Sequence, residues 1–116
     1  MGTTAAALVK AAKASVTEVS VTNAKDLVGQ GVVFVDVREP SEWQAGTISD
    51  ALRIPRGVLE WRAEEDAPLK DKSTPIVVYC KSGGRSALAA QTLGQLGFDS
   101  VQSLAGGYEA WIAKSA

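Results

Sequence analysis

Short runs of β-branched apolar residues alternate along this chain with longer stretches of helical pattern, and this alternation constrains the fold more than any other feature. The strongest runs are GVVFVDV (31–37) and PIVVYC (75–80), which are almost continuously apolar and therefore typical of strands buried on both faces of a sheet. Weaker strands are predicted at 16–19, 52–54 and 101–104, and helices at 22–28, 40–44, 57–65, 85–96 and 108–114. The pattern predicts an α/β fold with about five strands in a mostly parallel sheet, helices on both faces, and ligands bound beyond the carboxyl ends of the strands.

The length of 116 residues predicts one compact domain. Residues 1–15 are expected to form a helical extension that precedes a domain of residues 16–116. The apolar segment 5–14 of this extension contains two lysines, so it does not resemble an export signal. It could pack on its own domain or on a neighbouring copy, which leaves both a monomer and a homodimer open. Residues 66–74 are expected to form a long surface connection.

The composition argues against several classes of function. Twelve Lys and Arg against thirteen Asp and Glu give a net charge of −1 with no basic stripe, so nucleic-acid binding is not expected. The longest uncharged stretch, 86–98, is shorter than the roughly 20 apolar residues of a membrane span, and we expect a cytoplasmic protein with no membrane contact. The chain has one cysteine, Cys80, and no histidine, which excludes Cys-His catalysis and histidine-ligated metals within it. We expect no metal and no cofactor.

The segment IVVYCKSGGRS concentrates the features that make a cysteine reactive. Cys80 ends a predicted buried strand, and five residues later Arg85 opens a helix. Gly83 and Gly84 permit a tight turn whose N–H groups converge on the sulfur, and the positive end of the helix adds to the stabilisation of a thiolate. Lys81 and Arg85 are the only charged residues near Cys80 in the sequence, which indicates an anionic substrate. The alternative is a small core cysteine followed by a plain turn.

Three motifs resemble those of single-domain rhodaneses, the thiosulfate sulfurtransferase-like proteins. They are FVDVREPSEWQAGTISDALRIP (34–55), VVYCKSGGRSALAA (77–90) and LAGGYEAW (104–111), in the order and spacing of that family. The resemblance implies a rhodanese-like fold in which Cys80 carries a persulfide. It also implies a six-residue active-site loop, 80–85, one residue shorter than the loop of phosphatases with this fold, and this difference favours sulfur transfer over phosphate hydrolysis.

The resemblance also assigns roles to further residues. The substrate would be bound by Lys81, Ser82, Gly83, Gly84, Arg85 and Ser86. Asp36, Arg38 and Glu39 match the family's Asp-Val-Arg-Glu and would support the loop, although an ordinary surface ion pair is an equally good interpretation. Trp61 and Arg56 would lie at the mouth of the pocket.

The remaining tryptophans and two departures from the family pattern bear on packing. Trp43 and Trp111 are predicted to pack in the core. Thr47 replaces a common histidine and Asp50 replaces a usual glycine, both outside the active-site loop. These two departures concern local packing rather than chemistry.

These observations predict a transferase that moves sulfur in two steps. A small anionic donor such as thiosulfate would give its outer sulfur to Cys80, and a thiol, a protein or cyanide would then accept it. Two alternatives stay open: a non-catalytic persulfide carrier that serves a partner protein, and an arsenate reductase or phosphatase that uses the same cysteine.

Overall fold

The computed structural model describes residues 2–48 and 50–115, so the outermost residues of the two predicted ranges, Met1 and Ala116, lie outside the described part. Its centre is a five-stranded sheet in the order β1-β5-β4-β2-β3, and every pairing in it is parallel. The strands are β1 (Thr17–Val19), β2 (Val33–Asp36), β3 (Leu52–Arg53), β4 (Ile76–Tyr79) and β5 (Val101–Leu104). The prediction of an α/β fold with about five parallel strands is confirmed.

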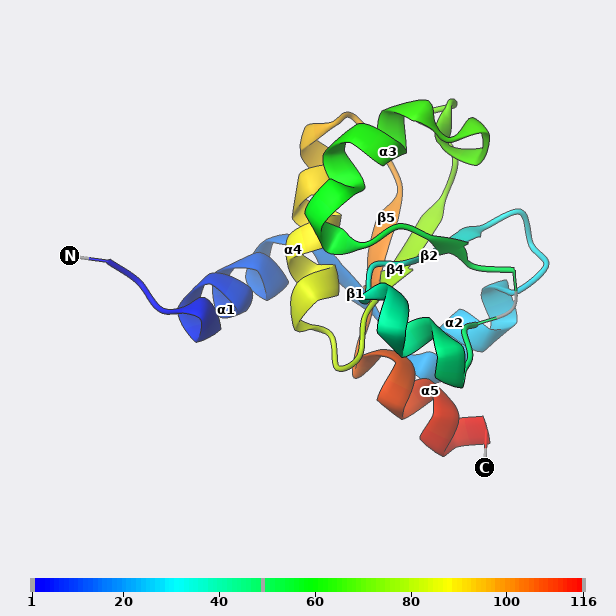
Figure 1. Cartoon of the computed structure of the whole chain (residues 1–116), viewed down its shortest axis with the longest axis horizontal. Coiled ribbons are helices and arrows are strands. Elements are labelled where there is room, and N and C mark those ends of the chain that lie inside the picture. The colour runs from blue at the N-terminus through cyan, green and yellow to red at the C-terminus, as the bar shows by residue number, and fades with distance from the viewer. Residues whose placement is uncertain (1, 49, 116) are drawn as a thin grey trace.

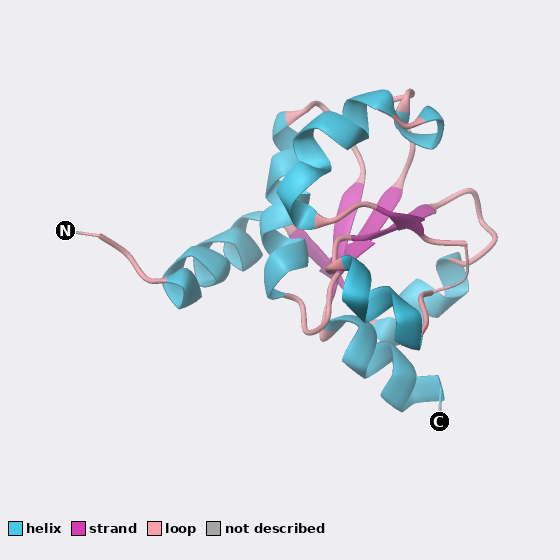
Figure 2. Cartoon of the chain, in the orientation of Figure 1, coloured by secondary structure: helices cyan, strands magenta, loops and turns pink. Residues whose placement is uncertain are grey.

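Helices cover both faces of the sheet, as Figure 2 shows. They are α1 (Ala5–Ser15), α2 (Val21–Leu27), α3 (Leu59–Glu65), α4 (Gly84–Gln95) and α5 (Gly107–Ser115). Three short 3-10 helices accompany them: η1 (Pro40–Ala45), η2 (Arg56–Val58) and η3 (Ala67–Leu69). The helix predicted at 40–44 is therefore η1, and the one predicted at 57–65 is divided between η2 and α3.

Alternation along β4 divides its side chains between two apolar cores. Ile76, Val78 and Cys80 belong to the core beneath α3 and α4. Val77 and Tyr79 belong to the core on the opposite face. Because successive side chains of a strand point to opposite faces, the register of β4 places the cysteine on the α4 side of the sheet.

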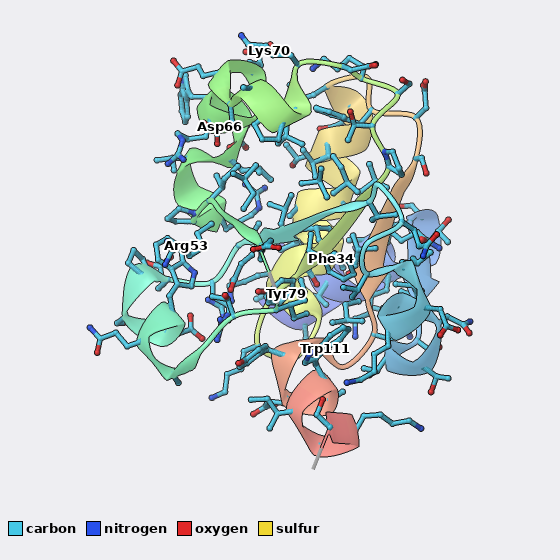
Figure 3. All side chains as sticks on the ribbon, turned by 90° about the vertical axis from the view of Figure 1, so that its right-hand side faces the viewer. Phe34, Arg53, Asp66, Lys70, Tyr79 and Trp111 are labelled. Atoms are coloured by element: carbon cyan, nitrogen blue, oxygen red, sulfur yellow. The ribbon has the colours of Figure 1, made fainter. Side chains whose placement is uncertain are left out.

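The second core is closed by α5. Trp111 meets Phe34 edge to face with ring centroids 6.0 Å apart, and both lie near Tyr79 where α5 reaches the sheet (Figure 3). Trp111 therefore packs in the core as predicted. Trp43 is half-buried beneath the guanidinium of Arg53, which lies 5.7 Å from its ring centroid.

Residues 66–74 were expected to form a surface connection, but they include η3, whose Leu69 is buried in the first core because its apolar side chain fills space beside α3.

Asp50 has a φ of +56°, a left-handed conformation that glycine adopts without strain and aspartate tolerates better than most residues. This conformation explains why a glycine would be usual at position 50.

The helical extension α1 packs on its own domain. It runs beside α4, while the chain before it extends away from the domain (Figure 1). Thr4 caps its first turn by accepting a hydrogen bond from the Ala7 N–H at 3.0 Å, and Ala12 is buried against the domain. Across the described residues, the helices are too short and too polar to cross a membrane.

Candidate active site

Cys80 lies at the middle of the carboxyl edge of the sheet. It directly follows β4, which is flanked by β2 and β5. The chain after β4 passes through α4 and forms β5, which lies on one side of β4. On the other side of β4 lies β2, and the chain after β2 forms β3 farther out on that side. Open α/β sheets bind ligands where the order of strands diverges in this way. The cysteine therefore stands where the fold favours a binding site.

The sulfur of Cys80 takes the place of a helix-capping side chain. It accepts hydrogen bonds from the N–H groups of Gly83 at 3.1 Å and Ser86 at 3.4 Å, at the first turn of α4. Helix N-termini leave such N–H groups without partners inside the helix, and they favour an anion. Because a thiolate is a better acceptor than a thiol, this geometry stabilises the charged form of the sulfur.

Two glycines in different motifs allow the loop to close. Gly83 has a φ of +109°, in the left-handed region, as expected for the turn, whereas Gly84 has no positive φ and is an ordinary first residue of α4, so the expectation holds for Gly83 only. Gly107 has a φ of +62°, and a methyl group on it would lie 2.5 Å from the Cys80 carbonyl oxygen. The N–H groups of Tyr108 and Glu109 donate to the carbonyl oxygens of Cys80 and Lys81, at 2.8 and 3.1 Å. The start of α5 is thus fastened to the backbone of the active-site loop.

A buried pair of hydroxyl groups extends from the sulfur into the sheet. The Ser86 Oγ lies 3.6 Å from Cys80 Sγ and 2.8 Å from the Ser103 Oγ on β5. Both serines are fully buried. With Ser103 oriented against it, Ser86 can turn its hydroxyl hydrogen toward a thiolate. Nothing in the sequence indicates this role of Ser103, because it stands 17 positions from Ser86, on β5.

Arg85 forms an ion pair with Glu42, a residue that the sequence analysis did not identify. Its guanidinium donates two hydrogen bonds to Glu42 on η1, at 2.8 and 3.1 Å. Mainly through this contact, the pKa of the Glu42 carboxyl falls from 4.5 to about 2, and the pKa of Arg85 is raised. In the sequence Lys81 and Arg85 are the only charged residues near Cys80, but in the structure the charge of Arg85 is largely balanced by Glu42. Glu42 stands 43 positions before Arg85 in the sequence, so the residues around Cys80 do not indicate this contact. The only sequence signal for Glu42 is that it lies within the motif 34–55.

Asp36 and Arg38 form a buried pair that anchors η1. Arg38 donates to Asp36 with its Nη2 at 2.7 Å, and both side chains are almost fully buried. The interpretation as a surface ion pair is therefore wrong, because the two residues lie at the end of a strand that helices cover. Arg38 also donates to the backbone oxygens of Glu42 and Gly46 at 3.2 and 2.7 Å. It thereby fixes the segment that carries Glu42.

The other predicted site residues differ in their exposure and in the groups they contact. Lys81 and Ser82 are exposed in the loop, and Gly84 opens α4. Glu39 is exposed before η1, and its N–H donates to Glu42 Oε1 at 2.8 Å. Arg56 pairs with Glu60 at 3.3 Å and donates to Thr92 on α4 at 3.1 Å, whereas Trp61 is 66% exposed on α3. Among the described residues, no group of three His, Cys, Asp or Glu side chains could hold a metal ion.

Comparison with known proteins identifies the family of this chain. The profile of the rhodanese-like domain matches residues 20–114, most of the chain. The chain belongs to the rhodanese family. Helix α1 precedes the matched region.

Individual relatives in this family carry different names. A sulfurtransferase of Allochromatium vinosum is 39% identical over 82 residues, which cover 71% of this chain and 73% of that protein. The chloroplastic thiosulfate sulfurtransferase 16 of Arabidopsis thaliana is 38% identical over 101 residues, covering 80% and 84%. The solved structure of a Rhodopseudomonas palustris protein of unknown function, described as a possible tyrosine phosphatase, superposes with a TM-score of 0.89 at 30% identity. It covers 100% of this chain and 94% of its own, so that likeness includes α1. The relatives named as sulfurtransferases support a rhodanese-type transferase.

Proposed function

We propose that this protein transfers sulfane sulfur from thiosulfate, or a related anionic donor, to a thiophilic acceptor through a persulfide on Cys80. The observation that carries this proposal is the Cys80 sulfur, which accepts hydrogen bonds from the N–H groups of Gly83 and Ser86 where the loop leads into α4. The same donors that stabilise a thiolate can hold the terminal sulfur anion of a persulfide. The names of the two sulfurtransferase relatives support the same chemistry.

The first step forms a persulfide and releases sulfite. The Cys80 thiolate attacks the outer sulfur of thiosulfate, a new S–S bond forms, and the old S–S bond breaks as sulfite leaves with the bonding electron pair. In the second step the acceptor attacks the outer sulfur, and Cys80 leaves as a thiolate. Cyanide would give thiocyanate in this step, and a thiol would give a new persulfide. Neither step requires a proton transfer at the donor, which suits a chain without histidine.

Phosphoester hydrolysis is the competing use of the same cysteine, and the R. palustris structure gives it a specific reason. That reaction usually needs a carboxylic acid to protonate the leaving group. Glu42 is the carboxyl group bound to the loop, but its pKa of about 2 and its contact with Arg85 keep it ionised at neutral pH. The short loop and this ionised carboxylate both favour sulfur transfer.

Intact-mass measurement tests the proposal. The reduced protein is incubated with thiosulfate, its mass is recorded, and cyanide is then added while thiocyanate is followed, with Cys80→Ser in parallel. We expect the wild type alone to gain one sulfur and to turn over many times. No gain of sulfur from thiosulfate or polysulfide would overturn the proposal, and activity on a phosphoester or arsenate in the same preparation would assign the site to the competing chemistry. One rapid stoichiometric exchange with a protein, without turnover on small acceptors, would identify a persulfide carrier instead of an enzyme.

A further inference from the structure

Helix α1 forms one wall beside the active-site loop, although it precedes the region matched by the family profile. A methyl group on Gly84, the first residue of α4, would lie 3.6 Å from a methyl carbon of Val9. At the other end of α1, Gln91 of α4 donates to Ser15 Oγ at 3.3 Å. These contacts hold α1 against α4, and Figure 1 shows α1 projecting from the side of α4 toward the N-terminus.

This packing brings Lys13 to the loop. A methyl group on Gly83 would lie 3.9 Å from Lys13 Nζ. Gly83 also donates its N–H to Cys80 Sγ at 3.1 Å, so ordinary bond lengths place the ammonium within about 10 Å of the sulfur. Lys10 and Lys13 are both exposed on α1, but only Lys13 is among the atoms nearest to the loop glycines.

The charge of Lys13 is uncompensated within the described part of the chain. It forms no ion pair with any described residue, whereas Arg85 is neutralised by Glu42. Lys13 and Lys81 are both exposed, and Lys81 likewise forms no ion pair with a described residue, so salt screens both charges. Lys13 therefore adds to the positive potential that an approaching anion meets near the sulfur.

We propose that Lys13 determines donor specificity: it attracts anionic sulfur donors to Cys80 and favours them over neutral ones. The identity of the donor rests on the proposed function, but the effect of the charge on Cys80 does not. A unit charge at about 10 Å, in surroundings between water and protein surface, changes the encounter rate of a monoanion about threefold and of a dianion such as thiosulfate about tenfold.

Two alkylating agents of similar size measure this potential without any sulfur transfer. Iodoacetate carries one negative charge and iodoacetamide carries none, so the ratio of their rates at Cys80 isolates the electrostatic part of the reaction. The ratio is measured for the wild type, for Lys13→Met, for Lys13→Arg, and for Lys10→Met as the matched control on the same helix. The rate of sulfur gain from thiosulfate is measured on the same four proteins.

We expect Lys13→Met to lower the iodoacetate-to-iodoacetamide ratio about threefold at low salt, and Lys13→Arg and Lys10→Met to leave it close to wild type. The difference should vanish near 1 M salt, where the Debye length is about 3 Å. Sulfur gain from thiosulfate should fall about tenfold in Lys13→Met. An unchanged ratio in Lys13→Met, or an equal fall in Lys10→Met, would overturn the proposal. A lowered ratio in a protein that gains no sulfur would uphold the electrostatic role of Lys13 while the proposed function fails.

Discussion

Gly107→Ala tests whether α5 holds the active-site loop in place. Gly107 has a φ of +62°, and a Cβ on it would lie 2.5 Å from the Cys80 oxygen and 2.6 Å from the Lys81 carbonyl carbon and oxygen. All three atoms belong to the backbone, so no side chain can turn away to relieve the contact. The loop and the start of α5 must separate by close to 1 Å to restore ordinary van der Waals distances.

The expected loss of stability has two parts. A non-glycine residue in the left-handed region costs about 1 kcal/mol, after allowing for the reduced freedom of the unfolded chain. Separation of α5 from the loop weakens the two hydrogen bonds that Tyr108 and Glu109 donate, each worth about 1 kcal/mol. We therefore expect Gly107→Ala to lower the free energy of unfolding by about 2–3 kcal/mol, the upper value if both hydrogen bonds are lost. Because the displaced backbone carries Cys80, sulfur gain from thiosulfate should fall by up to about a hundredfold.

Gly29→Ala is the matched control. Gly29 has a φ of +79°, but a methyl group on it would meet nothing within 4 Å. Gly29→Ala should lower the free energy of unfolding by about 1 kcal/mol, the conformational part alone, and Cys80 should keep its full reactivity. Urea unfolding of the two variants and the wild type gives the free energies, and intact mass gives the rate of sulfur gain. If Gly107→Ala loses no more stability than Gly29→Ala and reacts normally, the reasoning about α5 is wrong.

Three further predictions concern the polar contacts around the loop. Glu42→Gln should lower stability at pH 7 by about 1 kcal/mol, discounted because the ion pair is partly exposed. With a pKa of about 2, the carboxylate contributes above pH 4.5 and loses its effect as the pH falls toward 2, so urea unfolding at pH 2.5 should show a smaller difference; an equal difference contradicts this. Arg38→Met should cost about 3–5 kcal/mol in urea unfolding, because the buried Asp36 loses its partner, and a loss below about 1 kcal/mol would refute the pairing. Ser86→Ala and Ser103→Ala should show a coupling of about 1 kcal/mol in a double-mutant cycle, and additive losses would show that their hydroxyls act independently.

Local pattern was enough to predict the fold class and the place of Cys80. The apolar runs around 33–36 and 76–79 form the central strands because few other structures bury residues of this kind on both faces. The position of Cys80 follows from the same pattern, since the end of a parallel strand leads into the start of a helix. The sequence predicts helices at 40–44 and 57–65 but does not distinguish the 3-10 geometry of η1 and η2 from an α-helix, because helix ends fray and short terminal turns are often 3-10.

The sequence by itself determined the parallel sheet, the strand-to-helix turn after Cys80 and the glycine that lets the turn close, because each depends on residues close together in the chain. Only the tertiary structure decided which distant groups surround that turn. Glu42 pairs with the guanidinium of Arg85, and the Ser103 hydroxyl shares a hydrogen bond with that of Ser86. Lys13 of α1 lies beside Gly83. Charge near a cysteine cannot be counted along the sequence, since electrostatic interactions depend on distance in space and on burial, and the packing of helices on the sheet sets both.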